Sequence, residues 1–379
     1  MNDNFIIPDY NKDYNFIDLM RTLYNRIGIN IKDFKSLDNY IPKSNHYLFI
    51  LCDGMGSNLL KKLDQNSLLK KNKKMDLLTI FPSTTGCVLS SLATGEFPSK
   101  HGIWGWFNYN KQMDLNYYPV LFSRREDKKN LKEINVKLNN IFMCKSLLKQ
   151  KTDYNINILF PSKIVNSDYS KFVGYNKNRY GYENDSDIFN LVKSNCLKYK
   201  KTFTYLYISD IDSIEHANGI DSDIVFNRIT EIDNLLKKMS KIRDLTIVIT
   251  ADHGQTNVSK KIIFDYEKYE KYFYAKPSID CGTMSYYVKE QYENEFNKRF
   301  CDEYNECVLF KTVELEKKGY FKNKLSKYAN ESIGNYISVC KKDYYMISSD
   351  LTEKKEELKG NHSGLLPDEM IIPLIVIKN

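Results

Sequence analysis

The chain has 379 residues, 42% of them hydrophobic, which is enough for one large α/β domain with an inserted cap or for two domains. Its net charge of +8 comes from lysines scattered along the whole chain. The densest run, residues 70–74, is predicted to be a solvated loop, so a stable nucleic-acid complex is not expected.

The N-terminal sequence, the apolar runs and the cysteines indicate the cellular compartment. The N-terminus lacks a basic segment followed by a long apolar stretch, so we expect no signal peptide. The longest apolar run, Met370–Ile377, is too short to cross a bilayer. Eight cysteines without CxxC pairing favour free thiols in a reducing cytoplasm, and not zinc held by cysteine.

Apolar, β-rich segments alternate with helical patterns along the chain. The predicted strands are His46–Cys52, Leu77–Phe81, Ile156–Phe160, Phe203–Ile208, Leu245–Thr250 and Met370–Ile377. Asp221–Ile242 shows helical spacing, with Ile224, Val225 and Met239 among the residues on one side, and leads into the next strand. Such alternation is typical of a parallel sheet covered on both faces. We therefore predict an α/β fold with a doubly wound, mostly parallel sheet and helices on both faces.

Two stretches are less regular. Residues 108–201 are rich in tyrosine and asparagine. Apart from the strand within Asn155–Pro161, we interpret them as loops that extend from the sheet close to the active site. Residues from about 264 to 358 combine short strand-like pieces with a polar helix near Glu290–Arg299, which predicts a small inserted α+β cap. No linker separates independent domains, so we expect one catalytic domain over 1–379 that carries this cap.

Side chains that bind metals gather after the predicted strands. Asp53, Asp212 and Asp252 each follow one of them. In open α/β sheets ligands bind beyond the carboxyl ends of the strands, so these carboxylates should converge on one crevice. Only five histidines occur in the chain, and three of them lie in these segments or near the C-terminus: His216, His253 and His362.

Aspartate and histidine together suit zinc, with manganese as a second possibility. Asp212 and His216 are four residues apart, so on a helical turn they face the same way. The adjacent Asp252 and His253 can reach one ion only at a tight turn. Each piece also has an ordinary interpretation, since Asp-Gly after a strand is usually a turn and an Asp/His pair usually lies on a helix surface. Their joint occurrence at strand ends favours a metal centre.

Thr85 is the hydroxyl best placed to be a nucleophile. It follows the predicted strand and Pro82, and it precedes a helix predicted over Cys87–Ala93. A helix N-terminus offers backbone N–H groups to a phosphate, and two ions about 4 Å apart can clamp a phosphoryl group. The alternative is that Ser83, Thr84 and Thr85 only cap the helix.

Three blocks carry a family resemblance. Phe81–Gly86, Ser91–Ile103 and Gly360–Met370 resemble the nucleophile and final-histidine regions of the alkaline phosphatase superfamily, in its type I phosphodiesterase/nucleotide pyrophosphatase branch. The resemblance implies an alkaline phosphatase-like fold with two zinc ions. It implies one ion held by Asp212, His216 and His362, and the other by Asp53, Asp252 and His253. It further implies that Thr85 sits at the second ion and forms a phospho-threonine intermediate, whereas His101 matches no ligand position and is structural.

The substrate contacts depart from that pattern. Family members usually place an asparagine soon after the segment that ends at Ile103 here, whereas this chain continues with two tryptophans. Asn108 could take the place of that asparagine, and Trp106 could stack on a base or wall the pocket. The sulfatase signature does not occur after Thr85, which disfavours sulfatase chemistry. The classical phosphomonoesterases of the superfamily clamp the phosphate with an arginine, and no arginine lies near a motif here, which favours diesters over monoesters.

The sequence thus predicts a cytoplasmic two-zinc phosphodiesterase or nucleotide pyrophosphatase. Its expected substrate is a small phosphodiester or a nucleotide, cleaved through phospho-Thr85. A phosphomonoesterase or phosphonate hydrolase of the same fold is the runner-up, and a phosphomutase is less favoured. A non-catalytic metal-binding protein on this scaffold would have lost ligands or the nucleophile, and no such loss is visible.

Overall fold

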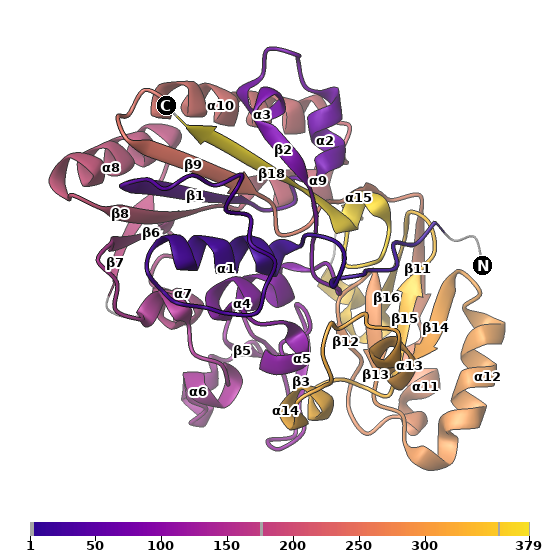
Figure 1. The fold of residues 1–379 in the computed structure, drawn as a ribbon. Coiled ribbons are helices and arrows are strands. Elements are labelled where there is room, and N and C mark those ends of the chain that lie inside the picture. The colour runs from indigo at the N-terminus through magenta and orange to yellow at the C-terminus, as the bar shows by residue number, and fades with distance from the viewer. Residues whose placement is uncertain (1–3, 175–176, 355–356, 379) are drawn as a thin grey trace.

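The computed structural model describes residues 4–174, 177–354 and 357–378, and its core is a seven-stranded sheet (Figure 1). The strand order is β2 (Lys73–Leu78), β18 (Ile371–Lys378), β9 (Leu245–Thr250), β1 (His46–Cys52), β8 (Thr202–Ile208), β6 (Asn155–Pro161) and β7 (Asn178–Tyr182). From β9 to β7 all neighbours are parallel, and β18 is antiparallel to both β9 and β2. The predicted mostly parallel α/β sheet is confirmed.

Helices cover both faces of this sheet. Figure 1 shows α1 (Phe16–Arg26), α4 (Thr85–Thr94) and α7 (Asp168–Gly174) on one face, and α8 (Asp185–Lys198) and α10 (Asp223–Met239) on the other. Because both faces are covered, every residue of β1, β8 and β9 is buried, which explains their continuous apolar sequences. The short helices α2 (Ser57–Lys62) and α3 (Leu68–Lys71) connect β1 to β2.

The predicted helix over Asp221–Ile242 is present as α10, but Ile224 was assigned to the wrong side. Its side chain is 53% exposed, whereas the buried stripe runs through Val225, Ile229, Ile232 and Leu236. These four residues follow the spacing of four and three that keeps side chains on one face of a helix. Ile224 falls outside that spacing.

The strand predicted at Leu77–Phe81 was placed too late. β2 begins at Lys73 and ends at Leu78, and it is the last strand at one edge of the sheet, beside β18. Lysines and a solvent-facing Asp76 are ordinary on an edge strand, but in the sequence they looked like a loop. Thr79 already leaves the ladder, and Phe81 donates its N–H to the hydroxyl of Tyr10 at 2.8 Å.

Residues 108–201 contain more regular structure than the sequence indicated. A small antiparallel sheet consists of β3 (Asn108–Asn110), β4 (Leu115–Tyr118) and β5 (Ser123–Arg124). The helix α8 was missed because only three of its residues are buried, which leaves almost no apolar stripe to detect. The segment also includes α6 (Leu138–Ile141) and short 3₁₀ turns at Leu131–Ile134 and Leu147–Lys149, and α5 (Pro98–His101) precedes it.

Residues 264–358 build a second layer beside the central sheet (Figure 1). Its antiparallel sheet has the order β12 (Ser278–Ile279), β13 (Thr283–Tyr286), β15 (Tyr336–Cys340) and β14 (Cys307–Lys311). A hydrophobic cluster of its own includes Phe264, Tyr286 and Phe296. The helices here are α11 (Tyr266–Tyr269), α12 (Glu293–Glu303), α13 (Thr312–Lys317) and α14 (Lys327–Glu331). Whether this layer is a cap on a single catalytic domain stays a prediction.

Two short pairings connect that layer to the rest of the chain. β11 (Lys260–Phe264) pairs in parallel with β16 (Tyr344–Ser348), and β10 (Thr256–Asn257) pairs antiparallel with β17 (Gly360–Asn361). The chain therefore enters and leaves the second layer at neighbouring points. Beyond β17, α15 (Pro367–Met370) leads into β18. Within the described ranges, no helix is long and apolar enough to span a membrane.

Arg228 on α10 fixes the start of α9 (Asp210–Asn218), the helix that carries Asp212. Its guanidinium contacts Asp210 at 2.7 Å and Asp185 at 2.9 Å, and only 14% of its side chain is exposed. We expect Arg228→Met to lower the free energy of unfolding by about 1–2 kcal/mol, because two partly exposed carboxylates lose their counter-charge. Urea unfolding measures this. Glu231→Gln removes the charge of a partner that is 63% exposed, and it should change the free energy of unfolding by less than about 0.5 kcal/mol. Equal losses in the two variants would contradict the prediction.

Candidate metal centre

Three neighbouring strands deliver three carboxylates to one place. Asp53 follows β1, Asp252 follows β9, and Asp212 lies in the first turn of α9 after β8. The hydroxyl of Tyr207 donates to Asp53 Oδ2, while Asp252 Oδ1 accepts from the N–H groups of Gly54 at 3.2 Å and His253 at 2.9 Å. Among the described residues, Asp53 Oδ1 and Asp252 Oδ2 are buried and have no hydrogen-bond partner.

The three predicted histidine ligands share one arrangement. Each Nδ1 contacts a backbone carbonyl, at 2.7 Å for His216, 3.2 Å for His253 and 3.0 Å for His362. A carbonyl only accepts, so each Nδ1 carries the hydrogen and each Nε2 keeps a free lone pair. Orientation of this kind by an outer hydrogen bond is typical of histidines that bind metals through Nε2.

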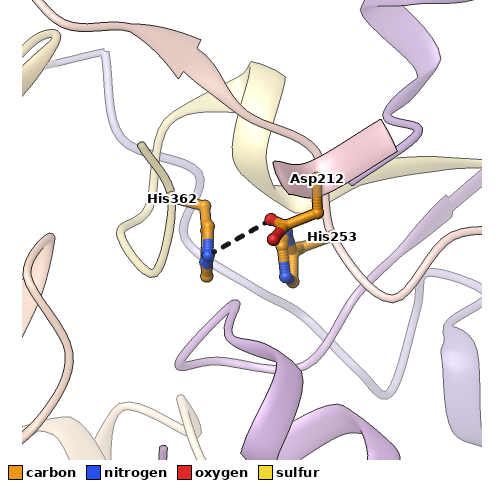
Figure 2. Close-up of side chains that lie close together, drawn as sticks. All are labelled: Asp212, His253 and His362. Atoms are coloured by element: carbon orange, nitrogen blue, oxygen red, sulfur yellow. Dashed lines mark ion pairs between the residues drawn. The ribbon is translucent and has the colours of Figure 1, made fainter. Parts of the chain in front are cut away.

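The free Nε2 atoms face the carboxylates. His216 Nε2 and His362 Nε2 lie 3.4 Å and 3.7 Å from Asp212 Oδ1, and His253 Nε2 lies 3.3 Å from Asp252 Oδ2. Figure 2 shows Asp212, His253 and His362 converging. Gln255 donates to Asp212 Oδ1 at 2.6 Å and so holds this carboxylate in place.

Two overlapping clusters result. In each cluster, one candidate ligand atom from every residue lies within 4.8 Å of the others. One cluster is Asp53, Asp252 and His253, which is the predicted triad of the second ion. The other brings Asp212 and His362 together with His253, and His216 Nε2 lies 3.4 Å from Asp212 Oδ1. Which ligand serves which ion stays a prediction.

The buried carboxylates with an unpartnered oxygen create an electrostatic environment that favours bound cations. Burial, followed by the charges of Asp252 and Asp212, raises the pKa of Asp53 well above its ordinary value, and burial raises the pKa of Asp252 to about 6. Burial also lowers the pKa of His253 and His362 to about 4, which keeps their imidazoles neutral. Unpartnered carboxylate oxygens and neutral imidazoles form a donor set that fits zinc or manganese.

Thr85 is the first residue of α4 and lies against this centre. Its hydroxyl is 3.1 Å from His253 Nε2. The capping alternative is wrong, because no side chain caps α4. Ser83 donates instead to the carbonyl of Gly364 at 2.9 Å, and Thr84 donates to Asp280 Oδ2 at 2.7 Å.

A cavity of about 620 Å³ opens beside Thr85. Besides Thr85, its described lining is Trp106, Asp212, Ser213, His216, Ala217, Asp280, Glu357, Leu358, Asn361 and His362. Trp106 therefore lies where a wall residue was predicted. Asn108 does not line this cavity: its side chain accepts from the N–H of Trp104 at 2.8 Å and donates to the carbonyl of Gly105 at 2.7 Å. These hydrogen bonds engage the side chain of Asn108 with the backbone of its own loop, so we do not expect Asn108 to contact the substrate.

The remaining two histidines lie outside the clusters. His101 accepts the N–H of Ile103 at 3.1 Å and contacts the hydroxyl of Ser91 at 2.8 Å, so both ring nitrogens are occupied. Burial lowers its pKa to about 3. His46 begins β1, at the opposite end of that strand from Asp53, and its Nδ1 lies 3.0 Å from the hydroxyl of Thr202.

Three residues of the site, Tyr207, Gln255 and Asp280, were not predicted from the sequence. Tyr207 lies within a continuous apolar strand, where a tyrosine is ordinary. Gln255 follows the Ala-Asp-His-Gly segment and could have been found from its proximity to it. Asp280 lies in the irregular stretch after β12, and no local pattern distinguishes it from the other acidic residues there.

His216 offers a test of the ligand set. We expect His216→Ala to lower the zinc content by about one ion per chain and to weaken zinc binding about 10- to 100-fold or more, because one of the inner donors is lost. Elemental analysis of the protein after gel filtration measures this. His46→Ala is the matched control, with metal content unchanged. A full complement of metal in His216→Ala would remove this residue from the ligand set.

The comparisons with known proteins agree with this geometry in fold. Murine ectonucleotide pyrophosphatase/phosphodiesterase 5 is 16% identical, with 88% of each chain covered and a TM-score of 0.64. An inactive threonine-to-alanine variant of that murine protein, solved with AMP, is 15% identical over 86% of this chain and 87% of the other, with a TM-score of 0.63. Phosphonoacetate hydrolase from Sinorhizobium meliloti 1021, in complex with phosphonoformate, is 15% identical over 89% of this chain and 91% of the other, with a TM-score of 0.65.

The sequence itself gives the family. Residues 47–365 match the model of the family described as type I phosphodiesterase/nucleotide pyrophosphatase. This span contains Asp53, Thr85, Asp212, Asp252 and His362, together with the two other candidate histidine ligands. The resemblance to the alkaline phosphatase superfamily is thereby confirmed. This chain belongs to the type I phosphodiesterase/nucleotide pyrophosphatase family.

Proposed function

We propose that this protein is a metal-dependent phosphodiesterase that holds two divalent cations, with zinc preferred and manganese as the second choice, and cleaves a small phosphodiester or a nucleotide through a phospho-threonine at Thr85. The observation that carries the proposal is the pair of overlapping ligand clusters, with the Thr85 hydroxyl 3.1 Å from the shared His253. The family membership supports hydrolysis of phosphate esters.

The proposed reaction has two steps at Thr85. When bound, the cations lower the pKa of the Thr85 hydroxyl and offset the charge that develops on the phosphoryl oxygens. Thr85 Oγ attacks phosphorus, the bond to the leaving alcohol breaks, and a threonine phosphodiester forms. Water then cleaves this ester, releases a phosphomonoester and regenerates Thr85.

The chain supplies the positioning for this chemistry. The N-terminal turn of α4 is uncapped by side chains and faces the site through Thr85, so its N–H groups can bind phosphoryl oxygens. Tyr207 and Gln255 hold the carboxylates of Asp53 and Asp212 by hydrogen bonds. Trp106 walls the cavity that receives the rest of the substrate.

A phosphonate hydrolase is the second candidate. The similarity to phosphonoacetate hydrolase in complex with phosphonoformate favours it. Phosphonoformate carries a carboxylate beside the phosphonate, however, and the described lining of the cavity here holds two further acids, Asp280 and Glu357, and no basic residue. The charge of the site therefore favours the diesterase.

A comparison of rates tests the proposal. The zinc-loaded protein should cleave bis(p-nitrophenyl) phosphate at least about tenfold faster, in kcat/KM, than p-nitrophenyl phosphate, and it should release no phosphate from phosphonoacetate. A faster monoesterase would favour the phosphomonoesterase alternative, and turnover of phosphonoacetate would favour the phosphonate hydrolase. No cleavage of any of the three, with two ions bound, would leave the non-catalytic metal-binding protein.

For the cellular setting we propose the cytoplasm and a small-molecule substrate, without a stable nucleic-acid partner. All eight cysteines lie in the described residues and are free thiols, as expected in a reducing compartment. The lysines behind the net charge of +8 are scattered along the chain, and the cavity beside Thr85 is lined by acids, which opposes binding of a polyanion there.

A further inference from the structure

Two buried cysteines face each other in the second layer. Cys307 is the first residue of β14, and it pairs directly with Cys340, the last residue of β15. Their Sγ atoms lie 3.4 Å apart, and the two residues are only 6% and 5% exposed. Both belong to the hydrophobic cluster of this layer, and both are free thiols. Neither is among the candidate metal ligands.

The backbone at this pair suits a disulfide. The N–H of Lys341 donates to the carbonyl of Glu306 at 2.9 Å, so the neighbouring pair of residues is joined by a backbone hydrogen bond. Bonded and non-bonded pairs alternate along an antiparallel ladder, and the Cα atoms of a non-bonded pair are about 4.5 Å apart. The N–H groups of Cys307 and Cys340 donate to carbonyls outside this pair of strands, at 3.1 Å and 2.9 Å. The two cysteines are thus a non-bonded pair, with a Cα separation that a disulfide can span.

The place of the pair in the sheet decides which oxidant can reach it. β14 is the last strand of its sheet, and Cys307 lies two residues after the exposed Asn305. Contact with Cys307, followed by burial, raises the pKa of the Cys340 thiol well above its ordinary value, so Cys340 keeps its proton. Cys307 is therefore the thiol that reacts first. Because both residues are mostly covered, a small uncharged oxidant reaches them more easily than a bulky disulfide reagent.

The strand end at Cys340 is connected to the segment of His362. Cys340 donates its N–H to the carbonyl of Gly282 at 2.9 Å, and Gly282 donates its own N–H to the hydroxyl oxygen of Ser363 at 2.8 Å. A Cβ on Gly282 would lie 2.4 Å from the carbonyl oxygen of His362, so these two backbones are in direct contact. A change in the stability of β15 should therefore reach the segment that carries His362.

The chain between the two cysteines, which are 33 positions apart, also contacts the region of the site. It includes α14, where the carbonyl of Ala329 accepts the indole N–H of Trp104 at 3.2 Å. Ser332, directly after α14, donates its hydroxyl to the carbonyl of Gly102 at 2.9 Å. A bond that closes this loop lowers the entropy of the opened layer, so that local opening becomes rarer.

We infer that Cys307 and Cys340 form a reversible disulfide when the protein meets a peroxide, and that this bond cross-links the second layer and stabilises the segment of His362. In a reducing compartment such a bond is transient, as is usual for disulfides that respond to oxidants. The inference assigns a modification site outside the metal centre. It holds for any substrate of the protein and does not depend on the mechanism proposed at Thr85.

Hydrogen peroxide is the oxidant in two steps. The sulfur of Cys307 takes one oxygen of the peroxide, the O–O bond breaks, and the other oxygen leaves as water with the thiol proton. The sulfur of Cys340 then attacks this sulfenic acid, the S–S bond forms, the S–O bond breaks, and a second water carries away the proton of Cys340. The two cysteines lose two hydrogens and two electrons, and the peroxide is reduced to two waters. A dithiol reverses the change by thiol–disulfide exchange.

Peptide mapping tests the bond itself. The zinc-loaded full-length protein is treated with hydrogen peroxide, its remaining thiols are alkylated, and its peptides are examined by mass spectrometry without reduction. We expect a cross-linked pair of peptides joining Cys307 to Cys340, about 2 Da lighter than the two free peptides together, which dithiothreitol separates again. Glutathione disulfide should form the same bond at least about tenfold more slowly. A bond from either cysteine to a different thiol, or a sulfinic acid in place of the bond, would overturn the inference, and equal rates would overturn the choice of peroxide.

Hydrogen exchange tests the effect on the second layer. In the oxidised protein, the amides of β13, β15 and residues 360–366 should exchange at least about tenfold more slowly than in the reduced protein, and Tm should rise by roughly 4 °C. The amides of β6, in the central sheet, are the internal reference and should change little. If the bond forms and neither exchange nor Tm responds, its role in stabilising the layer is wrong.

Serine variants assign both responses to the pair. Cys307→Ser should abolish the cross-linked peptides and the response of exchange and Tm to peroxide. Cys301→Ser removes an exposed thiol from α12 and is the matched control, with both responses retained. A full response in Cys307→Ser would overturn the assignment. The comparison of oxidised and reduced wild-type protein decides the inference even where a serine variant fails to fold.

Discussion

Replacing Thr85 by alanine is expected to lower kcat/KM on an aryl phosphodiester by at least about 10³-fold. The hydroxyl is the only group of α4 that both lies 3.1 Å from His253 and opens onto the cavity. Removal of a nucleophile usually costs several orders of magnitude, because no other group can form the covalent intermediate. Steady-state kinetics with the zinc-loaded variant measures this loss.

Two controls separate loss of the nucleophile from loss of structure. Thr85→Ser keeps a hydroxyl and should retain activity within about 100-fold of the wild type. Thr94→Ala makes the same substitution at the far end of α4, where the hydroxyl donates to the carbonyl of Ser90 at 2.8 Å and accepts the N–H of Glu96 at 3.3 Å, and it should leave activity within about twofold. Substantial activity in Thr85→Ala, or equal losses in both alanine variants, would contradict the role of Thr85.

Removal of the metal ions is the second change with a large expected effect. Dialysis against a chelator should lower the rate at least about 10³-fold, and zinc should restore it, because the ions supply several kcal/mol of transition-state stabilisation. Zinc at about 100 times its Kd should also raise Tm by roughly 3 °C for each ion bound, since each adds about 2.7 kcal/mol to the stability of the folded state. Differential scanning calorimetry and an aryl phosphodiester assay measure the two effects.

Asp53→Asn is the matched variant for this prediction. It removes one of the mutually repelling buried carboxylates and retains an oxygen that can accept from Tyr207. The metal-free variant should therefore be at least as stable as the metal-free wild type, yet it should gain little stability from zinc. If zinc raised the Tm of both proteins equally, Asp53 would not be a ligand. If chelation left the rate unchanged, the metal-dependent mechanism would be wrong.

Much of the site could be predicted from sequence because strand ends position it. Asp53, Asp212 and Asp252 each follow a strand whose continuous apolar residues are easy to recognise, and parallel neighbours must bring these ends together. The position of His216 follows from helical spacing in the same way. Local pattern and sheet topology were sufficient for these residues.

The parts that the sequence did not predict depend on contacts between distant segments. The late start assigned to the strand before Thr85 arose because Lys73 and Lys74 look like a loop until β18 is known to pair beside them. The position of Asn108 outside the cavity lining also depends on contacts made in the fold, since its side chain bonds to the backbone of its own loop. Asp280 reaches the site through the packing of Gly105 against Ile279, 174 residues apart in the chain, which no local pattern reports.

Chemical trapping of the intermediate tests the central claim most directly. The zinc-loaded protein is mixed with excess bis(p-nitrophenyl) phosphate, quenched in acid within the first turnovers, digested and examined by mass spectrometry. We predict that the peptide containing Thr85 carries the mass of the retained phosphoryl ester, with fragment ions that place it on Thr85, and that chelated protein shows none. Full turnover with an unmodified Thr85 peptide, accompanied by the phosphoryl group on another residue, would contradict the account.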